Sequence, residues 1–156
     1  MNQTLRQRPA LNKDNQFFFD ALTEGKICAQ QCSSCNEFRH PPVPMCPHCH
    51  SLDWRATEMG STGELVMYTV VHHPVIPPFA KGYIVGLVEL EHGVRLVMNL
   101  EYDESEVEIG QEVEVRPVQY DDDLVLPAGF KPGAPSRIVS STESVTDDDK
   151  AKGVSP

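Results

Sequence analysis

The chain has 156 residues and a formal net charge of −10 at pH 7. Residues 1–60 carry six basic and six acidic side chains, whereas residues 61–156 carry seven basic and seventeen acidic ones. Because nucleic-acid binding depends on Lys and Arg side chains that neutralise phosphates, we expect no nucleic-acid partner. The sequence lacks a secretory signal and any run of about 18 apolar residues, so we predict a soluble, cytoplasmic protein without a membrane partner.

A short aromatic helix is the first predicted element, in the segment DNQFFFDALTEGK that follows the polar residues 1–13. Asp14 is the predicted N-cap, and Gly25 is expected to end the helix. Three successive phenylalanines surround so short a helix, so part of its apolar surface must pack against a neighbouring domain or a partner protein. We therefore predict a partner-docking surface that includes Phe17, Phe18, Phe19 and Leu22.

Two Cys-x-x-Cys pairs separated by ten residues stand in CSSCNEFRHPPVPMCPHC, residues 32–49. Each pair can form a tight turn that presents two thiolates to one point, and two such turns complete the tetrahedral four-sulfur shell of a structural zinc ion. The predicted zinc ligands are Cys32, Cys35, Cys46 and Cys49. Two alternatives stay open: disulfide bonds, or a shell of three cysteines with one of His40, His48 and His50.

A zinc ion held by four thiolates has no open position for water or substrate. We therefore expect a structural metal and no Lewis-acid catalysis. The fifth cysteine, Cys28, has no neighbouring base in the sequence and is predicted to be a small buried hydrophobic residue.

Five strand patterns follow residue 60, namely GELVMYTVVHH, YIVGLVELE, VRLVMNL, EVEVRPV and DLVLP. The third pattern alternates, with one face formed by Val94, Leu96, Met98 and Leu100. Five strands without a long helical pattern indicate a small closed barrel of the OB type. We predict a mainly β protein with a helix and zinc ribbon in residues 1–59, a barrel in residues 60–132 and a disordered acidic tail in residues 133–156.

The segment HHPVIPPFAKGY forms a long Pro-rich loop between the first two predicted strands. Its apolar side chains cannot easily fold inward, so Val75, Ile76 and Phe79 are added to the predicted partner-docking surface. His72 and His73 are of the residue type that acts in acid–base catalysis, but two histidines at a strand end are more often structural. We therefore assign no catalytic residue.

Together these features resemble a known family, the thiolase-associated proteins grouped as domain of unknown function 35. The resemblance rests on FFFDALTEGK, on CSSCNEFRHPPVPMCPHC followed by Trp54, and on the later segments GSTGELVMYTVVHHPVIPPF, YIVGLVELEHGVRLV and EIGQEVEV. It covers residues 15–132. The resemblance implies a rubredoxin-like zinc ribbon followed by a five-stranded OB-fold barrel.

Members of this family resemble accessory subunits of thiolase-like enzymes, which include thiolases, polyketide-type acyltransferases and aldolases that shorten steroid side chains. The resemblance implies a noncatalytic subunit that stabilises such an enzyme and helps to form its acyl-CoA site, with acyl-CoA as a shared ligand. The nucleophile would belong to the partner, so we expect no enzymatic activity of this chain on its own. The alternatives are a nucleic-acid-binding zinc ribbon and OB-fold module, and an autonomous acyl-CoA binder or enzyme.

Overall fold

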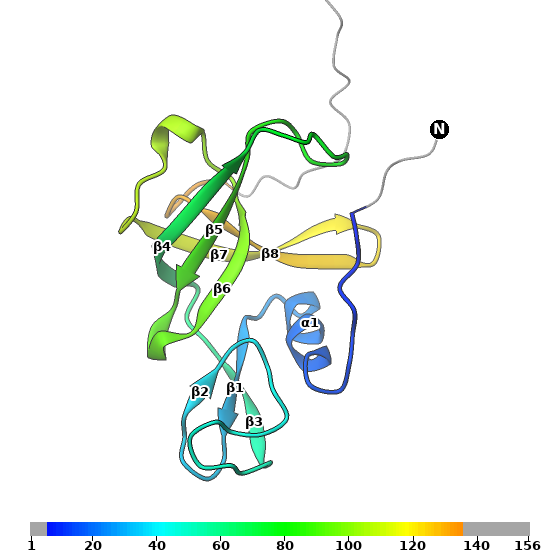
Figure 1. Ribbon diagram of the computed structural model, residues 1–156, viewed down its shortest axis with the longest axis vertical. Helices are drawn as coiled ribbons and strands as arrows, with labels where there is room; N and C mark the ends of the chain where they lie inside the picture. The colour runs from blue at the N-terminus through cyan, green and yellow to red at the C-terminus, as the bar shows by residue number, and fades with distance from the viewer. Residues whose placement is uncertain (1–5, 136–156) are drawn as a thin grey trace, which may run out of the picture.

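The computed structural model describes residues 6–135, and strands dominate it (Figure 1). One helix, α1 (Gln16–Thr23), precedes the three ribbon strands β1 (Cys28–Cys32), β2 (Phe38–Arg39) and β3 (Trp54–Glu58). Five further strands are β4 (Thr62–Val71), β5 (Tyr83–Glu89), β6 (Arg95–Leu100), β7 (Glu112–Asp121) and β8 (Leu124–Phe130). Short 3-10 turns stand at η1 (Glu91–Gly93) and η2 (Glu104–Glu106).

The predicted disordered tail lies, from residue 136 on, outside the described residues. None of the helices within residues 6–135 has the length and apolar character needed to cross a membrane.

The five strands β4 to β8 form a closed barrel in the order β4-β5-β6-β8-β7, and β7 pairs with β4 to complete the ring. All pairs are antiparallel except β6 and β8, which run parallel, with Leu100 opposite Gly129. This arrangement confirms the predicted OB-type barrel. Gly129 is required at this point because a Cβ there would lie 2.6 Å from Leu100 Cδ2.

The alternation predicted for β6 is confirmed. The inward side chains are nearly inaccessible to solvent: Leu96, Met98 and Leu100 in β6, and Val94 directly before it. Between them, Arg95 and Val97 point outward and are exposed. The alternating pattern in the sequence therefore predicted both the strand and which of its side chains face the barrel interior.

Of the two helix ends predicted from the sequence, the structure confirms only the C-terminal end of α1. Gly25 has a φ of +79° and ends the helix as predicted. The N-cap is Asn15 rather than the predicted Asp14. The Asn12 side-chain oxygen accepts the backbone N–H groups of both Asp14 and Asn15, at 2.9 and 3.0 Å, and this turn delays the start of the helix by one residue.

One apolar core joins the helix, the ribbon and the barrel. It contains Phe18, Leu22, Ile27 and Met59 together with inward side chains of β4 to β7. Phe18 and Leu22 are 5% and 1% exposed, so the expectation that they belong to a docking surface is wrong: they pack within their own chain. The physical reason is that the barrel, and not the ribbon alone, covers this face of α1.

Candidate metal centre and neighbouring clefts

The four cysteines of the ribbon lie together, with their Sγ atoms all within 4.8 Å of one another. Two turns with matching backbone contacts bring them there. In the first turn the Asn36 N–H donates to the Cys32 carbonyl at 3.0 Å. In the second the His50 N–H donates to the Cys46 carbonyl at 2.9 Å. Asn36 and His50 both adopt a left-handed backbone, with φ of 62° and 60°, which lets the chain turn back tightly after each Cys-x-x-Cys pair.

Backbone N–H groups inside these turns stabilise thiolates. The N–H of Cys35 lowers the pKa of Cys32 to about 6, and the N–H of Cys49 lowers the pKa of Cys46. The N–H of Glu37 acts on Cys35 in the same direction, but burial and hydrogen bonds to the neighbouring sulfur atoms raise the pKa of Cys35 to about 12. The raised pKa of Cys35 shows that ionising it beside the other sulfur atoms is unfavourable without a neighbouring cation.

A divalent cation would supply the missing positive charge, and four sulfur donors at this spacing fit the tetrahedral shell of zinc. The ion would be held by the predicted ligands Cys32, Cys35, Cys46 and Cys49. Because the protein fills all four positions, such a zinc ion stabilises the ribbon and offers no site for a substrate.

Neither alternative to a four-sulfur shell is found. The sulfur atoms of Cys32 and Cys49 are 3.5 Å apart, far beyond the bond length of about 2.05 Å in a disulfide. His48 and His50 are exposed, and the metal-binding cluster within residues 6–135 contains cysteines alone. The third candidate, His40, lies against the ring of Phe18 instead, with 4.9 Å between the ring centroids.

Two further side chains near the ribbon are Cys28, which is buried, and His40, which is half-buried. Cys28 lies in β1 outside the cluster, and burial raises the pKa of its thiol, which agrees with the predicted role as a small hydrophobic residue. Burial lowers the pKa of His40 to about 4, so the imidazole is neutral at pH 7. The Nδ1 atom of His40 has no hydrogen-bond partner within the described part of the chain.

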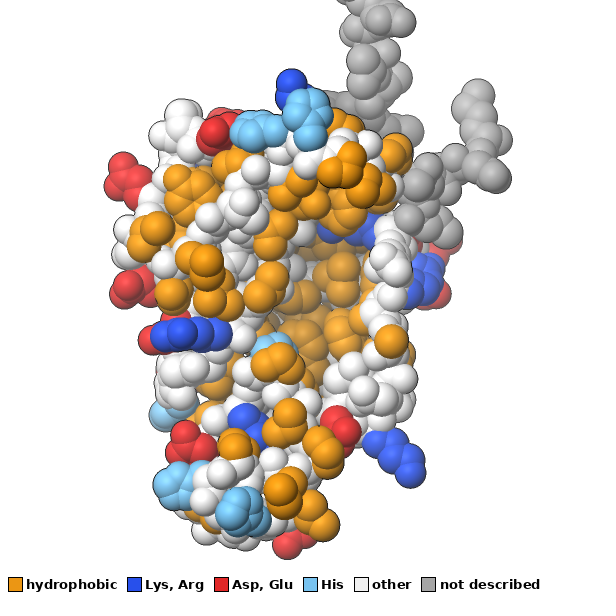
Figure 2. All heavy atoms as spheres, viewed as in Figure 1, with side chains coloured by type: hydrophobic (Ala, Val, Ile, Leu, Met, Phe, Trp, Pro, Cys, Tyr) orange, Lys and Arg blue, Asp and Glu red, His pale blue; other side chains and the backbone are white. Residues whose placement is uncertain are grey.

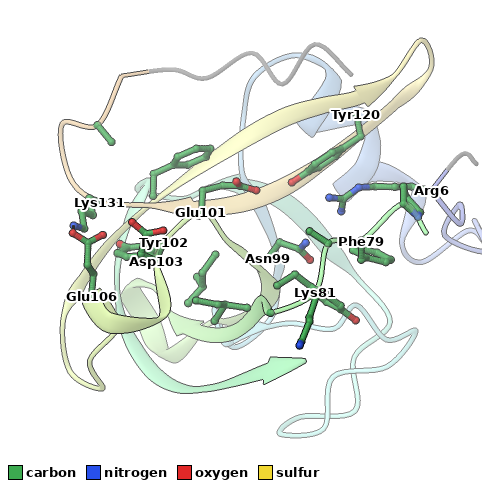
Figure 3. Close-up of a pocket in the computed structure, with 18 of the residues that line it drawn as sticks. Arg6, Phe79, Lys81, Asn99, Glu101, Tyr102, Asp103, Glu106, Tyr120 and Lys131 are labelled. Atoms are coloured by element: carbon green, nitrogen blue, oxygen red, sulfur yellow. Dashed lines mark ion pairs between the residues drawn. The ribbon is translucent and has the colours of Figure 1, made fainter. Parts of the chain in front are cut away.

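A cleft of about 720 Å³ opens beside the Pro-rich loop (Figure 3). Its apolar floor is formed by Ile84, Leu100 and Phe130, and the ring of Phe79 from the loop stacks on Tyr83 at 4.6 Å. Basic and acidic side chains share its rim: Arg6, Lys81 and Lys131 with Glu101, Asp103, Glu106 and Asp121. Lys131 is neutralised by Glu106 at 2.6 Å. The cleft therefore lacks the basic groove that nucleic acids require.

A second cleft of about 510 Å³ lies between α1, the ribbon and the barrel. Its apolar lining residues include the buried Phe18, the half-buried Phe19 and Leu126, and the exposed Val97. The hollow lined by hydrophobic side chains near the middle of Figure 2 shows this apolar character on the face in view. The two clefts are neighbours, because Arg6, Asn99 and Tyr120 line both of them.

The predicted docking residues fall into three groups in the structure. Val75 and Ile76 are exposed on the Pro-rich loop, while Phe79 is half-buried at the cleft. Phe17 and Phe19 are half-buried as well, and the ring of Phe17 packs against Trp54 at 4.8 Å. The structure buries Phe18 and Leu22 in the core.

Sequence reasoning missed Arg6, Asn99 and Tyr120 as cleft residues. Asn99 and Tyr120 lie near the ends of β6 and β7, beside loops that the sequence marks as surface, and this position was the available signal. His72 and His73 are exposed, and the nearest charged partner of His72 is Glu104 at 3.9 Å. Within the described residues they form no pair with a nucleophile.

Family models match most of the folded part of this chain. Residues 19–55 match the ChsH2 rubredoxin-like zinc ribbon domain, and residues 56–117 match the ChsH2 C-terminal OB-fold domain. The chain is 44% identical over 134 residues to a probable enoyl-CoA hydratase alpha subunit of Thermomonospora curvata, covering 85% of this chain and 42% of that protein. It is 29% identical over 116 residues to the 3-oxo-4,17-pregnadiene-20-carboxyl-CoA hydratase alpha subunit of Mycobacterium tuberculosis, covering 74% of this chain and 37% of that protein. The chain thus spans about two fifths of the length of these curated relatives.

Solved structures give the same assignment. A chain of the structure entitled Ltp2-ChsH2(DUF35) aldolase is 43% identical, with a TM-score of 0.77, and the match covers 80% of this chain and 99% of that one. A protein of unknown function from the DUF35 family of Sulfolobus solfataricus shares the fold, with a TM-score of 0.55, 18% identity and coverage of 74% and 82%. The predicted resemblance is therefore confirmed, and this chain belongs to the DUF35 family, with a ChsH2-type zinc ribbon and OB-fold barrel.

Proposed function

We propose that this chain is a noncatalytic accessory subunit of a thiolase-like enzyme that processes acyl-CoA substrates. The observation that carries the proposal is the 43% identity to a chain of the Ltp2-ChsH2(DUF35) aldolase, 99% of which is matched. The curated relatives, which are named as alpha subunits of CoA-ester hydratases, support a role within a larger enzyme. The closed four-thiolate site supports a structural rather than a catalytic metal.

The docking surface would extend from the Pro-rich loop over the outer face of β4, β5 and β6. The strand register places Met67 opposite Leu87, and Leu87 opposite Val97, so these side chains form one row across three strands. Met67 and Val97 are 56% and 67% exposed, and Ile76 on the loop is 58% exposed. Hydrophobic side chains also gather over these strands in Figure 2. Contiguous apolar surface of this kind is typical of a protein interface.

The acyl-CoA ligand would be shared at the 720 Å³ cleft, which opens beside the same loop. An apolar floor with a few polar groups at the rim is the usual composition of a small-molecule site. Lys81 is the exposed basic residue on the loop side of this rim and is the candidate contact for a CoA phosphate. In this proposal the partner supplies the nucleophile, and this chain supplies one wall of the pocket.

The proposal is tested by co-purification. A tagged chain is expressed with the thiolase-like protein that accompanies it in its native source, and Ile76→Asp and Val97→Asp are compared with wild type. We expect both variants to lose the partner, because burying a charge in an apolar interface is strongly unfavourable.

Leu52→Asp is the matched control, because Leu52 is an equally exposed apolar residue on the ribbon. It should retain the partner. Zinc content and circular dichroism of each isolated variant must match wild type, so that loss of binding is not loss of fold. Wild-type recovery of the partner by both Ile76→Asp and Val97→Asp would place the interface elsewhere.

A further inference from the structure

The guanidinium group of Arg6 lies between two aromatic rings that are far from it in the sequence. Its central carbon is 3.6 Å from the ring centroid of Tyr120 and 4.7 Å from that of Phe79 (Figure 3). Phe79 is itself held by stacking on Tyr83. A planar guanidinium placed over aromatic faces gains both cation–π attraction and stacking, which an ammonium group gains only in part. Phe79 and Tyr120 thus form an aromatic clamp suited to arginine.

Arg8 makes a second attachment two residues later. Its guanidinium forms an ion pair with Asp121 at 3.6 Å and donates a short hydrogen bond to Asp123. Both aspartates stand at the turn of the β7–β8 hairpin. Figure 1 shows the segment that precedes α1 running from the helix toward this hairpin. Two arginines therefore fasten residues 6–9, here named the strap, to the acidic second half of the chain.

Side chains alone hold the strap in place. Within the described part of the chain, no backbone–backbone hydrogen bond involves residues 6–11. The firm attachment begins at Ala10, whose carbonyl accepts a hydrogen bond from the Asn15 side chain at 3.0 Å. The strap can therefore leave the barrel without breaking any strand or helix, and Ala10 marks the point from which it would swing.

The strap covers the junction of the two clefts. Residues 6–9 form one wall of the 510 Å³ cleft, opposite Phe19, Val97 and Leu126. Arg6 also lines the 720 Å³ cleft, so its side chain lies at the boundary of the two spaces, together with Asn99 and Tyr120. Withdrawal of Arg6 would uncover the rings of Phe79 and Tyr120 at this boundary.

We propose that the clamp of Phe79 and Tyr120 is an arginine-recognition site, and that Arg6 occupies it in cis so that the strap covers the junction of the two clefts. The strap is open when Arg6 leaves the clamp and Arg8 leaves the hairpin. Every group in this device belongs to this chain, so it can be tested without the proposed partner. The position of the strap then determines how much apolar surface the chain exposes.

Arginine side-chain NMR tests the clamp directly in the full-length, zinc-loaded protein. A proton above an aromatic face is shifted upfield, so the Hε signal of Arg6 should be shifted upfield, and it is assigned by its absence in Arg6→Gln. Tyr120→Leu should return this signal to the ordinary arginine position. An ordinary Hε position for Arg6 in wild-type protein overturns the proposal, and this measurement requires no variant to be stable.

Dye binding tests whether the strap covers apolar surface at the junction of the clefts. The double variant Arg6→Gln/Arg8→Gln should bind a fluorescent apolar dye at least about threefold more than wild type, because the strap no longer covers the apolar floor. The matched control Arg55→Gln removes an exposed arginine on the ribbon and should leave dye binding unchanged. Zinc content and circular dichroism confirm that each variant is folded. Equal dye binding by the folded double variant and wild type would show that the strap covers no apolar surface.

Discussion

The ribbon and the barrel are ordered by different means. The ribbon has three short strands, of which β2 contains two residues, and its cross-link is the cysteine cluster at the far end from the barrel. The barrel closes on itself, so each strand pairs with two neighbours, and its interior is filled with apolar side chains. A small unit that lacks a sufficient core depends on its metal, whereas a closed sheet depends on packing.

The two regions nevertheless share one core. Met59 at the end of the ribbon donates its N–H to the Ile27 carbonyl at 2.8 Å, and the next residue, Gly60, donates to the Glu91 side chain at 2.7 Å. Phe18 and Leu22 of α1 pack on both sides of this junction. The helix therefore couples the stability of the ribbon to that of the barrel.

The largest expected effect comes from loss of the metal, which should unfold the ribbon but not the barrel. Cys46→Ser, or removal of zinc by a chelator, should unfold the ribbon, because structural zinc supplies on the order of 10 kcal/mol of folding free energy in small zinc domains. Trp54 in β3 packs against Phe17, so its fluorescence should change to that of an exposed indole. The far-UV circular dichroism of the barrel should remain.

Cys28→Ser is the control for this experiment, because Cys28 is buried but lies outside the cluster. It should keep one zinc ion per chain. Unchanged metal content and unchanged thermal stability in Cys46→Ser would show that the cluster binds no structural metal.

The features that sequence predicted well are those with a local cause. The spacing of Cys32 and Cys46 with their partners predicted the cluster, the alternation around Leu96 predicted the inward face of β6, and Gly25 predicted the end of the helix. Each depends on a few neighbouring residues and on backbone geometry. Such signals do not need the tertiary fold.

The features that sequence could not predict depend on contacts between distant segments. The aromatic pattern of α1 showed that Phe18 needs a covering surface, but only the folded chain shows that its own barrel covers it. The clamp of Arg6 joins an N-terminal segment, a loop and a strand end, and no local pattern marks such a site. The N-cap was misplaced because the Asn12 side chain holds Asp14 and Asn15 in a turn before the helix, a contact that the capping pattern does not reveal.

A smaller effect is expected from a substitution in the core that the ribbon and the barrel share. Phe18→Ala should lower the free energy of unfolding by about 3 to 5 kcal/mol, because it leaves a cavity between helix, ribbon and barrel. Urea unfolding followed separately by Trp54 fluorescence and by far-UV circular dichroism should show the ribbon signal changing before the barrel signal. Phe19→Ala is the control, because Phe19 is half-buried and should lose less. Coincident transitions in Phe18→Ala would mean that the helix does not couple the two regions.

The smallest expected effect concerns acid and the half-buried imidazole of His40, which lies beside Phe18. The folded chain holds the pKa of His40 at about 4 because burial disfavours the charged ring, whereas the ordinary value is 6.5. Between pH 6.5 and 4 the unfolded chain therefore binds a proton that the folded chain does not. Stability is full above pH 6.5 and falls as the pH decreases through this window, by up to about 3 kcal/mol.

His40→Gln removes this titration, and it breaks no hydrogen bond of Nδ1, which has no partner in the described residues. Urea unfolding of wild type and variant at pH 7 and pH 5, with excess zinc, separates this effect from acid release of the metal, because metal release affects both proteins equally. The stability difference between the two proteins should shift in favour of the variant at pH 5. An equal loss of stability in both proteins would show that acid acts through the zinc site alone, and that the junction between ribbon and helix has no pH sensitivity of its own.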